Sequence, residues 1–330
     1  MDTGTNLHRS VGTAPSLPRP SPAPAYLQLL DPEAMAKINR VELLARHPVE
    51  GFISGRHRSP YRGFSAEFAE HREYAPGDDL RDLDWRAYAK SDRFYIKQYV
   101  EETNLRATIL LDASGSMAYR GEAAARHRNQ PLSKFEYARF LAATLVRLLL
   151  SQQDAVGLVT FDATVRRYLP SRCRANHMSV LLEELFQTEP GEETALAPVL
   201  HNIAERVHRR GLLIVISDLF DRAEDLLKAL HHFRFRKHDV IVMHVMAEEE
   251  LTFPFKRWSE FKDLEQAGHT LELDPEALRA TYLGELRTFL AAIEKGCGEM
   301  KIDYVPFSTR QDFDMALAGY LAHRRSLVKQ

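Results

Sequence analysis

The chain has 330 residues, of which 45% are hydrophobic and 27% charged, proportions that are ordinary for a globular protein with one large domain or two small ones. Its formal net charge of −2 excludes a strong overall field that would draw it to nucleic acid or to an anionic membrane. It has two distant cysteines, Cys173 and Cys297, and no apolar stretch of the roughly 18 residues that span a bilayer, so we expect a cytoplasmic protein without a disulfide framework or a membrane span.

The first third of the chain divides into an arm and a small unit. Five prolines among Ser, Thr and Ala predict that residues 1–26 form a disordered or polyproline-like arm. Residues 27–104 have the pattern of a helix followed by a β-rich subdomain, which we expect to pack on the remainder of the chain. The predicted elements of this unit are a helix at 31–47, strands at Phe64–Tyr74 and Arg93–Glu101, and a short helix at Asp78–Ala89 between the two strands.

From residue 105 onward, predicted strands and helices alternate. This pattern predicts an α/β domain over residues 105–330 with a doubly wound, mostly parallel sheet of Rossmann type, covered by helices on both faces. The predicted strands are Arg106–Leu111, Ala155–Phe161, Leu212–Ile216, Val240–Val245 and Ile302–Val305, with Thr164–Tyr168 as an antiparallel edge strand. The predicted helices are Lys134–Gln152, Ala175–Phe186, Ala197–Arg209, Ala223–Phe233, Pro275–Lys295 and Phe313–His323.

A loop rich in oxygen-bearing side chains follows the first strand of this domain. The apolar run 107–111 ends in Asp112-Ala113-Ser114-Gly115-Ser116, which places one carboxylate and two hydroxyls at alternate positions. Ligands of open α/β sheets gather at the carboxyl ends of the strands, and oxygen ligands of this kind suit a hard divalent cation. Asp, Ser and Gly are also ordinary loop residues, so the motif alone is compatible with a surface loop that binds no metal.

Two distant residues strengthen the interpretation as a metal site. Asp218 follows another buried apolar run, 212–216, and Thr194 lies in a loop just before a predicted helix. Two strand ends therefore each contribute a carboxylate, and the loop between them contributes a hydroxyl. We predict that Asp112, Ser114, Ser116, Thr194 and Asp218 converge on Mg²⁺, Mn²⁺ or Ca²⁺.

These residues resemble the metal-ion-dependent adhesion site of von Willebrand factor A domains. That family combines a D-x-S-x-S motif with a loop Thr and a later strand-end Asp. The resemblance implies that Ser114, Ser116 and Thr194 supply hydroxyl ligands, and that Asp112 and Asp218 hold the ion directly or through water. It also implies an open coordination position for a carboxylate of a protein partner. The later Asp usually precedes Gly in the family, whereas here Leu219 follows it.

The segment before the sheet domain contains the pattern R-x-Y-x-P-G-D-D-x-R-x-[IL]-D-W, formed by Arg72, Tyr74, Pro76, Gly77, Asp78, Asp79, Arg81, Leu83, Asp84 and Trp85. This pattern resembles the hallmark block of the DUF58 family of bacterial proteins, and the resemblance extends from about Val49 to Arg325. It continues in the run Lys134-Phe135-Glu136-Tyr137-Ala138. Family members are often encoded beside MoxR-type AAA+ ATPases, so the implied partner is such an ATPase, and no enzymatic activity is implied.

Other charged clusters favour structural roles. The aspartates of the hallmark block lie on different faces of a predicted helix, which favours helix-start charges and salt bridges over a two-metal site. The basic run 231–238 closes a predicted helix and has no aromatic stacking platform, so we expect no nucleic-acid binding. The chain has no Walker-type phosphate loop and therefore should not hydrolyse ATP itself.

We therefore expect a divalent-cation-dependent protein-binding module and not an enzyme. Two alternatives stay open: a metal-dependent phosphoryl-transfer hydrolase, which would need a positioned base or a second metal, and a structural scaffold with a vacant site. The long polar loop Arg120–Pro131, next to the predicted metal, is equally consistent with a specificity loop and with a tolerated surface insertion.

Overall fold

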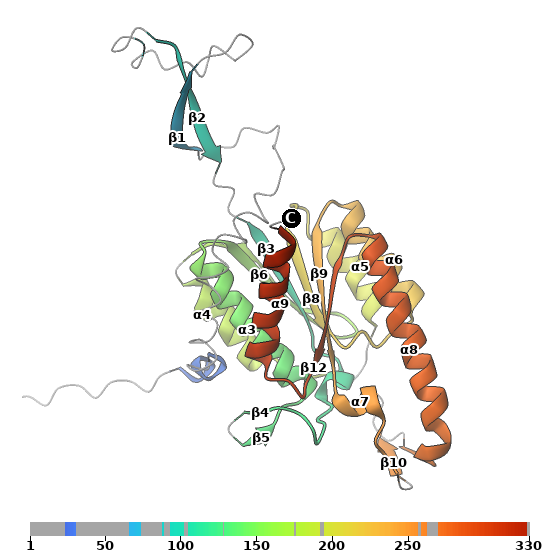
Figure 1. Cartoon of the computed structure of the whole chain (residues 1–330). Helices are drawn as coiled ribbons and strands as arrows, with labels where there is room; N and C mark the ends of the chain where they lie inside the picture. The colour runs from blue at the N-terminus through green and yellow to red at the C-terminus, as the bar shows by residue number, and fades with distance from the viewer. Residues whose placement is uncertain are drawn as a thin grey trace, which may run out of the picture.

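Six strands form the central sheet, in the order β12-β9-β8-β3-β6-β7 (Figure 1). Numbered along the chain, this is the Rossmann strand order 3-2-1-4-5-6, viewed from the other edge. Neighbouring strands from β12 to β6 are parallel, and β7 is an antiparallel edge strand. The bounds are β3 Arg106–Asp112, β6 Ala155–Phe161, β7 Val165–Arg172, β8 Leu212–Ser217, β9 Asp239–Met246 and β12 Asp303–Ser308. The computed structural model describes residues 24–30, 66–73, 88, 93–101, 105–127, 129–174, 176–191, 195–256, 259–262 and 270–328.

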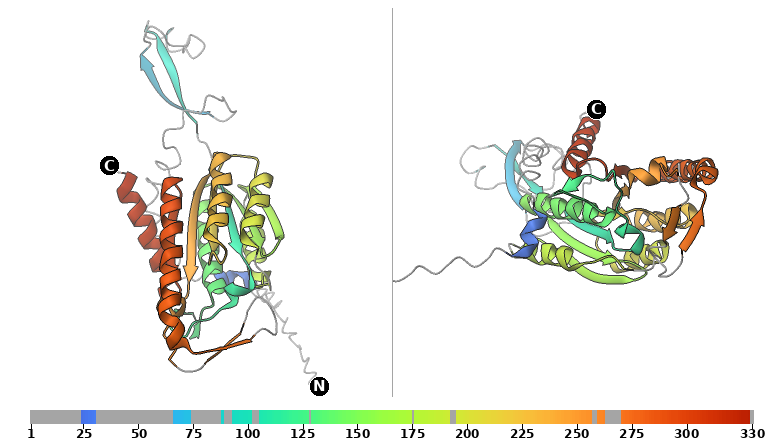
Figure 2. Two further views of the ribbon diagram at one scale, coloured as in Figure 1. Left: turned by 90° about the vertical axis from the view of Figure 1, so that its right-hand side faces the viewer. Right: turned by 90° about the horizontal axis from the view of Figure 1, so that it is seen from below.

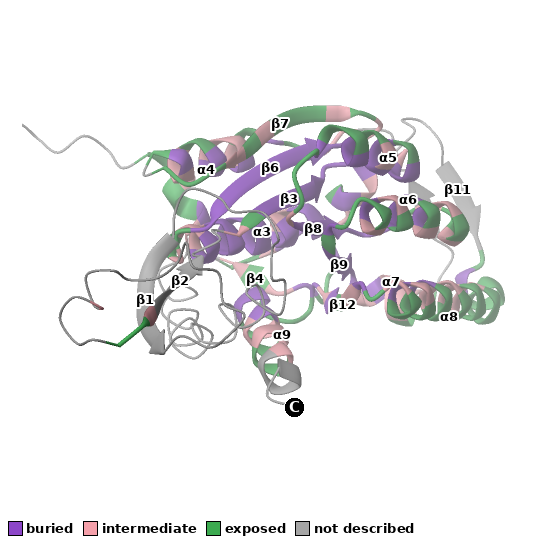
Figure 3. Cartoon of the chain, turned by 90° about the horizontal axis from the view of Figure 1, so that it is seen from above, coloured by how far each residue is buried: buried purple, intermediate pink, exposed green. Residues whose placement is uncertain are grey.

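Helices cover both faces of the sheet (Figure 3). In β3, Ile109 and Leu111 belong to a core that also contains residues of α3, α4 and α9, whereas Leu110 belongs to a second core with α5, α6 and α8. Alternate residues of the strand are therefore buried on opposite faces, which explains its continuous apolar sequence. The bounds are α3 Lys134–Ser151, α4 His177–Gln187, α5 Leu196–Arg206, α6 Ala223–Phe235, α8 Pro275–Glu299 and α9 Phe313–Val328.

The strand order and the two helical layers confirm the predicted doubly wound α/β fold. Local signals account for the ends of several helices. At the start of α3 the Ser133 hydroxyl accepts from the Glu136 N–H, while the Glu136 carboxylate accepts from the Ser133 N–H, forming a capping box. At the start of α8, Asp274 accepts from the Glu276 N–H and Pro275 occupies the first turn.

The structure contains short elements that sequence patterns did not predict. They are α7 Glu248–Thr252, the antiparallel pair β10 Ser259–Lys262 and β11 Thr270–Leu273, and the two-residue strands β4 Arg126–His127 and β5 Gln130–Pro131. Each is too short to show hydrophobic periodicity. The β4–β5 turn lies within the loop Arg120–Pro131, and Asn129 adopts a left-handed φ of 67° there.

The described part of the N-terminal region is limited. Strands β1 Ala66–Glu73 and β2 Tyr95–Glu101 pair antiparallel, close to the two predicted strands, and the pair stands apart from the central sheet (Figures 1 and 2). A 3-10 helix, η1 Ala25–Leu29, spans the expected boundary at residue 26, and Leu29 is buried in the α3/α4 core. The predicted helix at 31–47, residues 74–85 of the hallmark block, and the predicted helix Asp78–Ala89 apart from Tyr88 lie outside the described residues.

Gly157 permits close contact between β6 and β7. A Cβ atom there would lie 2.8 Å from both the Leu169 carbonyl oxygen and the Ser171 backbone nitrogen, at an irregularity in the strand pairing. In contrast, a Cβ at Gly284 in α8 would meet nothing within 4 Å. Gly157 is thus required by packing, and Gly284 is not.

We predict that Gly157→Ala lowers the free energy of unfolding by about 1–3 kcal/mol, because the added methyl group overpacks the strand pair. The control, Gly284→Ala, should raise it by about 0.5–1 kcal/mol because alanine has the higher helix propensity. Urea denaturation of both variants measures the two effects. Equal stability of the two variants would contradict the packing argument.

Candidate functional site

The two strand-end aspartates lie at the switch point of the sheet. Strands β3 and β8 are parallel neighbours, with Leu111 opposite Ile216. The chain leaves β3 towards β6 and leaves β8 towards β9, in opposite directions across the sheet. Asp112 is the last residue of β3, and Asp218 directly follows β8. Open α/β sheets bind ligands at this position, because the two loops diverge and leave a crevice.

Asp112 is fully buried, and its carboxylate organises both loops. Its Oδ1 accepts from the Ser114 N–H at 2.9 Å, and its Oδ2 accepts from the Ser217 hydroxyl at 2.5 Å. Ser217 Oγ in turn accepts from the Leu219 N–H at 2.9 Å. One carboxylate therefore links the turn after β3 to the turn after β8.

The two motif serines lie side by side at the start of a short 3-10 helix, η3 Gly115–Ala118. The Ser114 and Ser116 hydroxyl oxygens are 3.1 Å apart, with Ser114 buried and Ser116 half-buried. The Ser116 hydroxyl also helps to lower the pKa of the nearby Asp218 carboxyl group. The structure thus brings Asp112, Ser114, Ser116 and Asp218 together.

Asp218 is buried against a lysine. The Lys134 ammonium, on the first residue of α3, donates to Asp218 Oδ2 at 2.7 Å and to Glu250 Oε1 at 2.5 Å. Lys134 and Asp218 each have 3% of the side chain exposed. The Asp218 carbonyl oxygen is 2.8 Å from Nε2 of His244, and His244 Nδ1 is 2.7 Å from the Tyr304 hydroxyl.

The pKa values of the Asp112 and Asp218 carboxyl groups are shifted in opposite directions. Burial and the charge of Asp218 raise the pKa of Asp112, although its hydrogen bonds from Ser217 and Ser114 oppose this shift. Burial acts in the same direction on Asp218, but the Lys134 ammonium outweighs it and lowers the Asp218 pKa. The pKa of Lys134 is raised, because its two carboxylate partners outweigh burial. The site therefore holds one paired carboxylate and one that is short of positive charge.

Helix α7 connects the site to the surrounding loops. Glu250 binds Lys134 through Oε1 and accepts from the Ala247 N–H at the start of α7 through Oε2, at 2.7 Å. Glu249 accepts from the Ala123 N–H at 2.9 Å, which attaches the Arg120–Pro131 loop to α7. That loop is also held by the Ala125 N–H, which donates to the Thr309 carbonyl at 2.7 Å.

Thr194 lies outside the described residues. The chain on either side of it is attached to the two site loops. The Gly191 N–H donates to the Ala113 carbonyl at 2.6 Å, and the Ala197 N–H donates to Asp221 Oδ2 at 3.0 Å. The described residues that flank positions 192–194 are thus anchored beside the two strand ends.

The donor set is compatible with a hard divalent cation. It consists of oxygen atoms from two carboxylates and two hydroxyls, the ligand type that Mg²⁺ and Ca²⁺ prefer. Adjacent ligands of an octahedral Mg²⁺ are about 3 Å apart, close to the 3.1 Å between the Ser114 and Ser116 hydroxyls. Among the described residues no group of three His, Cys, Asp or Glu side chains is placed to bind a metal. An ion here would therefore depend on the hydroxyls and on water.

A family model described as "Protein of unknown function DUF58" matches residues 70–288 of this chain. The chain belongs to the DUF58 family. The match contains the whole hallmark block and both strand-end aspartates. Uncharacterized protein Rv1480 of Mycobacterium tuberculosis and uncharacterized protein Mb1516 of Mycobacterium bovis are similar to this DUF58 protein. Each is 24% identical over 302 residues, covering 89% of this chain and 91% of the relative.

Solved structures with similarity to this DUF58 protein include a conserved hypothetical protein BatB from Bacteroides thetaiotaomicron. It has 20% identity and a TM-score of 0.44, covering 67% of this chain and 99% of BatB. The SpRpn10 VWA domain has 11% identity and a TM-score of 0.38, covering 65% of this chain and 94% of the domain. In the described part of this DUF58 protein, no helix has both the length and the apolar character to cross a membrane.

The position after Asp218 shows how the DUF58 chain departs from the usual adhesion-site sequence. Leu219 has a φ of 54°, in the left-handed region that favours glycine. Its side chain is nevertheless buried, in the core that contains α5 and α6 residues. Burial of an apolar side chain thus offsets the backbone strain that glycine avoids.

Sequence analysis missed Ser217, Glu250 and the site role of Lys134. Lys134 did carry a local signal: it is a cation in the first turn of a capped helix, where the helix dipole disfavours positive charge. A buried acidic partner resolves that conflict. Ser217 and Glu250 had no comparable signal, because nothing in their local sequence indicates contact with Asp112 or Lys134.

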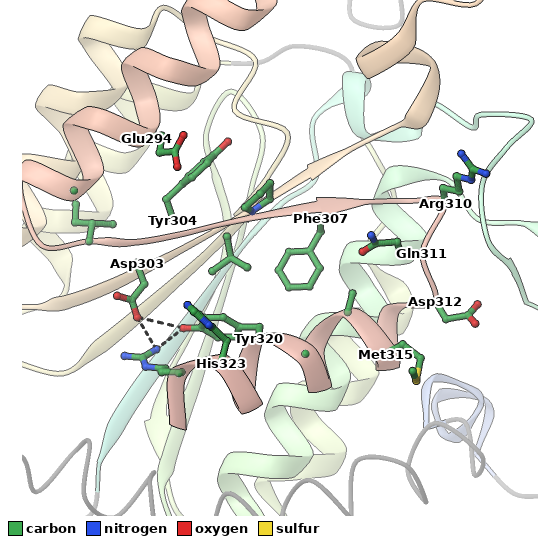
Figure 4. A pocket seen from close by; sticks show the side chains of 17 residues that line it. Glu294, Asp303, Tyr304, Phe307, Arg310, Gln311, Asp312, Met315, Tyr320 and His323 are labelled. Carbon is green, nitrogen blue, oxygen red and sulfur yellow. Dashed lines mark hydrogen bonds and ion pairs between the residues drawn. The ribbon is translucent and has the colours of Figure 1, made fainter. Parts of the chain in front are cut away.

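A groove lies elsewhere, away from the strand-end aspartates (Figure 4). It has a volume of about 1050 Å³ and lies between the edge strand β12, α9 and the end of α8. Phe307 and Tyr320 line it, and Arg324 closes one side by pairing with Asp303 at 3.0 Å. Neither Asp112 nor Asp218 contributes to this groove.

We predict opposite stability effects for the two aspartates in metal-free buffer at pH 7.5. Asp112→Asn should raise the free energy of unfolding by roughly 1 kcal/mol, because it removes a buried charge that has no cation and repels Asp218. Asp218→Asn should lower it by roughly 3 kcal/mol, because it leaves the buried Lys134 ammonium with one carboxylate fewer. Urea denaturation with EDTA present measures both. If both variants changed the free energy of unfolding in the same direction, that result would contradict the pairing of the Lys134 ammonium with Asp218.

Proposed function

We propose that this DUF58 protein is a divalent-cation-dependent protein-binding module. In this proposal Asp112, Ser114, Ser116 and Asp218 hold the ion, directly or through water, together with Thr194. When bound, the ion supplies a Lewis-acidic position that a carboxylate of the partner completes. The observation that carries the proposal is the convergence of two strand-end carboxylates and two hydroxyls at the switch point of the sheet.

The surroundings of the site favour binding over hydrolysis. His244, which contacts the Asp218 carbonyl, is buried, and both its ring nitrogens are engaged, one by the Tyr304 hydroxyl and one by the Asp218 carbonyl. Burial also lowers its pKa to about 4. It is therefore poorly placed to accept a proton from an attacking water. We accordingly propose that the protein has no hydrolase activity of its own.

An exposed aromatic side chain beside the site supports a protein partner. Phe220 lies two residues after Asp218 and is 67% exposed. Its N–H donates to Asp218 Oδ1 at 3.3 Å, which holds the start of this turn against the buried carboxylate. Aromatic side chains next to a polar anchor are frequent hot spots of protein interfaces. As its partner we propose a MoxR-type AAA+ ATPase that presents an Asp or Glu side chain.

We predict that the protein captures the purified MoxR-type ATPase of the same organism in Mg²⁺ but not in EDTA. Asp218→Ala should reduce the affinity at least tenfold, since it removes an ion-binding carboxylate. Phe220→Ala should also reduce it about tenfold, a typical loss for an interface hot spot. Surface plasmon resonance on the full chain measures these affinities.

The matched control is Phe235→Ala. Phe235 is 77% exposed and ends α6, at the opposite edge of the sheet from Asp218, so its replacement should leave the affinity within twofold. Capture that is indifferent to EDTA would contradict the metal-dependent proposal. Mg²⁺-dependent phosphatase or ATPase turnover that is lost in Asp112→Ala would favour the hydrolase alternative.

A further inference from the structure

The described structure already contains a cation at the carboxylate site, namely the ammonium group of Lys134. Its nitrogen lies 2.7 Å from Asp218 Oδ2 and 2.5 Å from Glu250 Oε1. The lysine side chain is 3% exposed, so this is a buried position and not a surface ion pair. A buried ammonium keeps its charge only where carboxylates compensate for lost hydration.

We propose that Lys134 is a built-in competitor of the divalent cation: its ammonium occupies Asp218 in the metal-free protein, and a metal ion must displace it towards Glu250. This inference rests on the proposed function, because it takes the strand-end oxygens to be the metal site. It adds a regulatory residue that neither the motif nor the family match identifies.

Competition follows from the shared carboxylate. The oxygen that holds the ammonium belongs to the carboxylate that would approach the ion, and two cations within a few ångströms repel strongly in a buried site. In the structure the Lys134 ammonium donates to Asp218 and Glu250, whereas the Asp112 oxygens accept from Ser114 and Ser217. Metal binding therefore requires the Lys134–Asp218 contact to weaken.

Glu250 can remain the ion-pair partner of the Lys134 ammonium when Asp218 no longer binds it. It binds Lys134 independently of Asp218, and its other oxygen is fixed by the Ala247 N–H at the start of α7. The Tyr119 ring, 6.0 Å from the lysine nitrogen, adds a second favourable surface for the cation. Lys134 can thus remain compensated while Asp218 turns to the metal.

The direct test measures Mg²⁺ affinity by isothermal titration calorimetry on the full chain. Lys134→Met keeps the length of the side chain and removes the charge, so we expect at least tenfold tighter Mg²⁺ binding than in the wild type. Lys134→Arg keeps the charge and should stay within threefold of the wild type. The control Lys228→Met removes a cation from an exposed pair with Asp225 on α6 and should change nothing.

Glu250→Gln provides a second test, made both in the wild type and in the Lys134→Met background. Without Glu250 the ammonium depends on Asp218 alone, so Mg²⁺ affinity should fall at least fivefold. In the Lys134→Met background the same change should have less than a twofold effect. If Glu250 acted only as a nearby negative charge, the loss would be equal in both backgrounds.

Thermal unfolding gives a further readout. Mg²⁺ should raise the melting temperature of Lys134→Met more than that of the wild type, since the variant binds the ion more tightly and lacks the internal cation. Unchanged Mg²⁺ affinity in Lys134→Met, or in Glu250→Gln, would overturn the competition and leave Lys134 a structural ion-pair partner.

The outcomes separate this inference from the proposed function. If Lys134→Met tightens Mg²⁺ binding but neither protein captures the ATPase, the competition stands and the proposed partner is wrong. If capture of the ATPase requires Mg²⁺ but Lys134→Met leaves the Mg²⁺ affinity unchanged, the proposed competition is wrong and the proposed function stands. Absence of Mg²⁺ binding in the wild type and in Lys134→Met alike would overturn both.

Discussion

The buried ion pair between Lys134 and Asp218 is the interaction on which the arrangement at the strand ends depends. Two carboxylates, Asp112 and Asp218, are buried at neighbouring ends of a parallel sheet, where their mutual repulsion and the loss of hydration both act against folding. The Lys134 ammonium compensates for one of them at 2.7 Å. Hydrogen bonds from Ser114 and Ser217 compensate partly for the other.

This electrostatic requirement explains the connections around α7. Helix α7 is only five residues long, yet each of its first three glutamates contacts a different segment. Glu248 accepts from Ser308 and pairs with Arg310 after β12, Glu249 holds the loop after β3, and Glu250 holds Lys134. Acidic side chains in the first turn are also favoured by the helix dipole. One short helix thereby contacts three separate segments: the chain after β12, the loop after β3 and the start of α3.

The family match supports membership of the DUF58 family, whereas the geometry of the strand-end residues supports the proposal about function. Membership of the DUF58 family rests on a match that includes the whole hallmark block and strands β3, β6, β7, β8 and β9 of the sheet. The proposal of a metal-dependent binding module rests on Asp112, Ser114, Ser116 and Asp218, which hydrogen bonds and charge interactions bring together. The exposed Phe220 beside Asp218 adds the apolar contact that a carboxylate anchor alone would lack.

The amino-acid sequence by itself predicted the strands of the sheet domain and placed Asp112 and Asp218 at the carboxyl ends of two of them. Continuous apolar runs predicted β3, β6 and β8 to within one residue at each end, because strands buried on both faces have no polar positions. The rule that ligands gather at the ends of parallel strands then placed Asp112 and Asp218 at one edge. Both inferences use only local patterns and a general property of the fold.

The tertiary structure alone decided which charges meet at that edge. Lys134 contacts Asp218 across 84 positions in the sequence and Glu250 across 116. These contacts arise because the strand order places β3 beside β8, and because the turn after β9 brings α7 over the start of α3. Hydrophobic periodicity carries no information about pairing between loops. The same sequence pattern therefore predicted a site with room for a cation, and only the folded chain revealed that a lysine already lies within it.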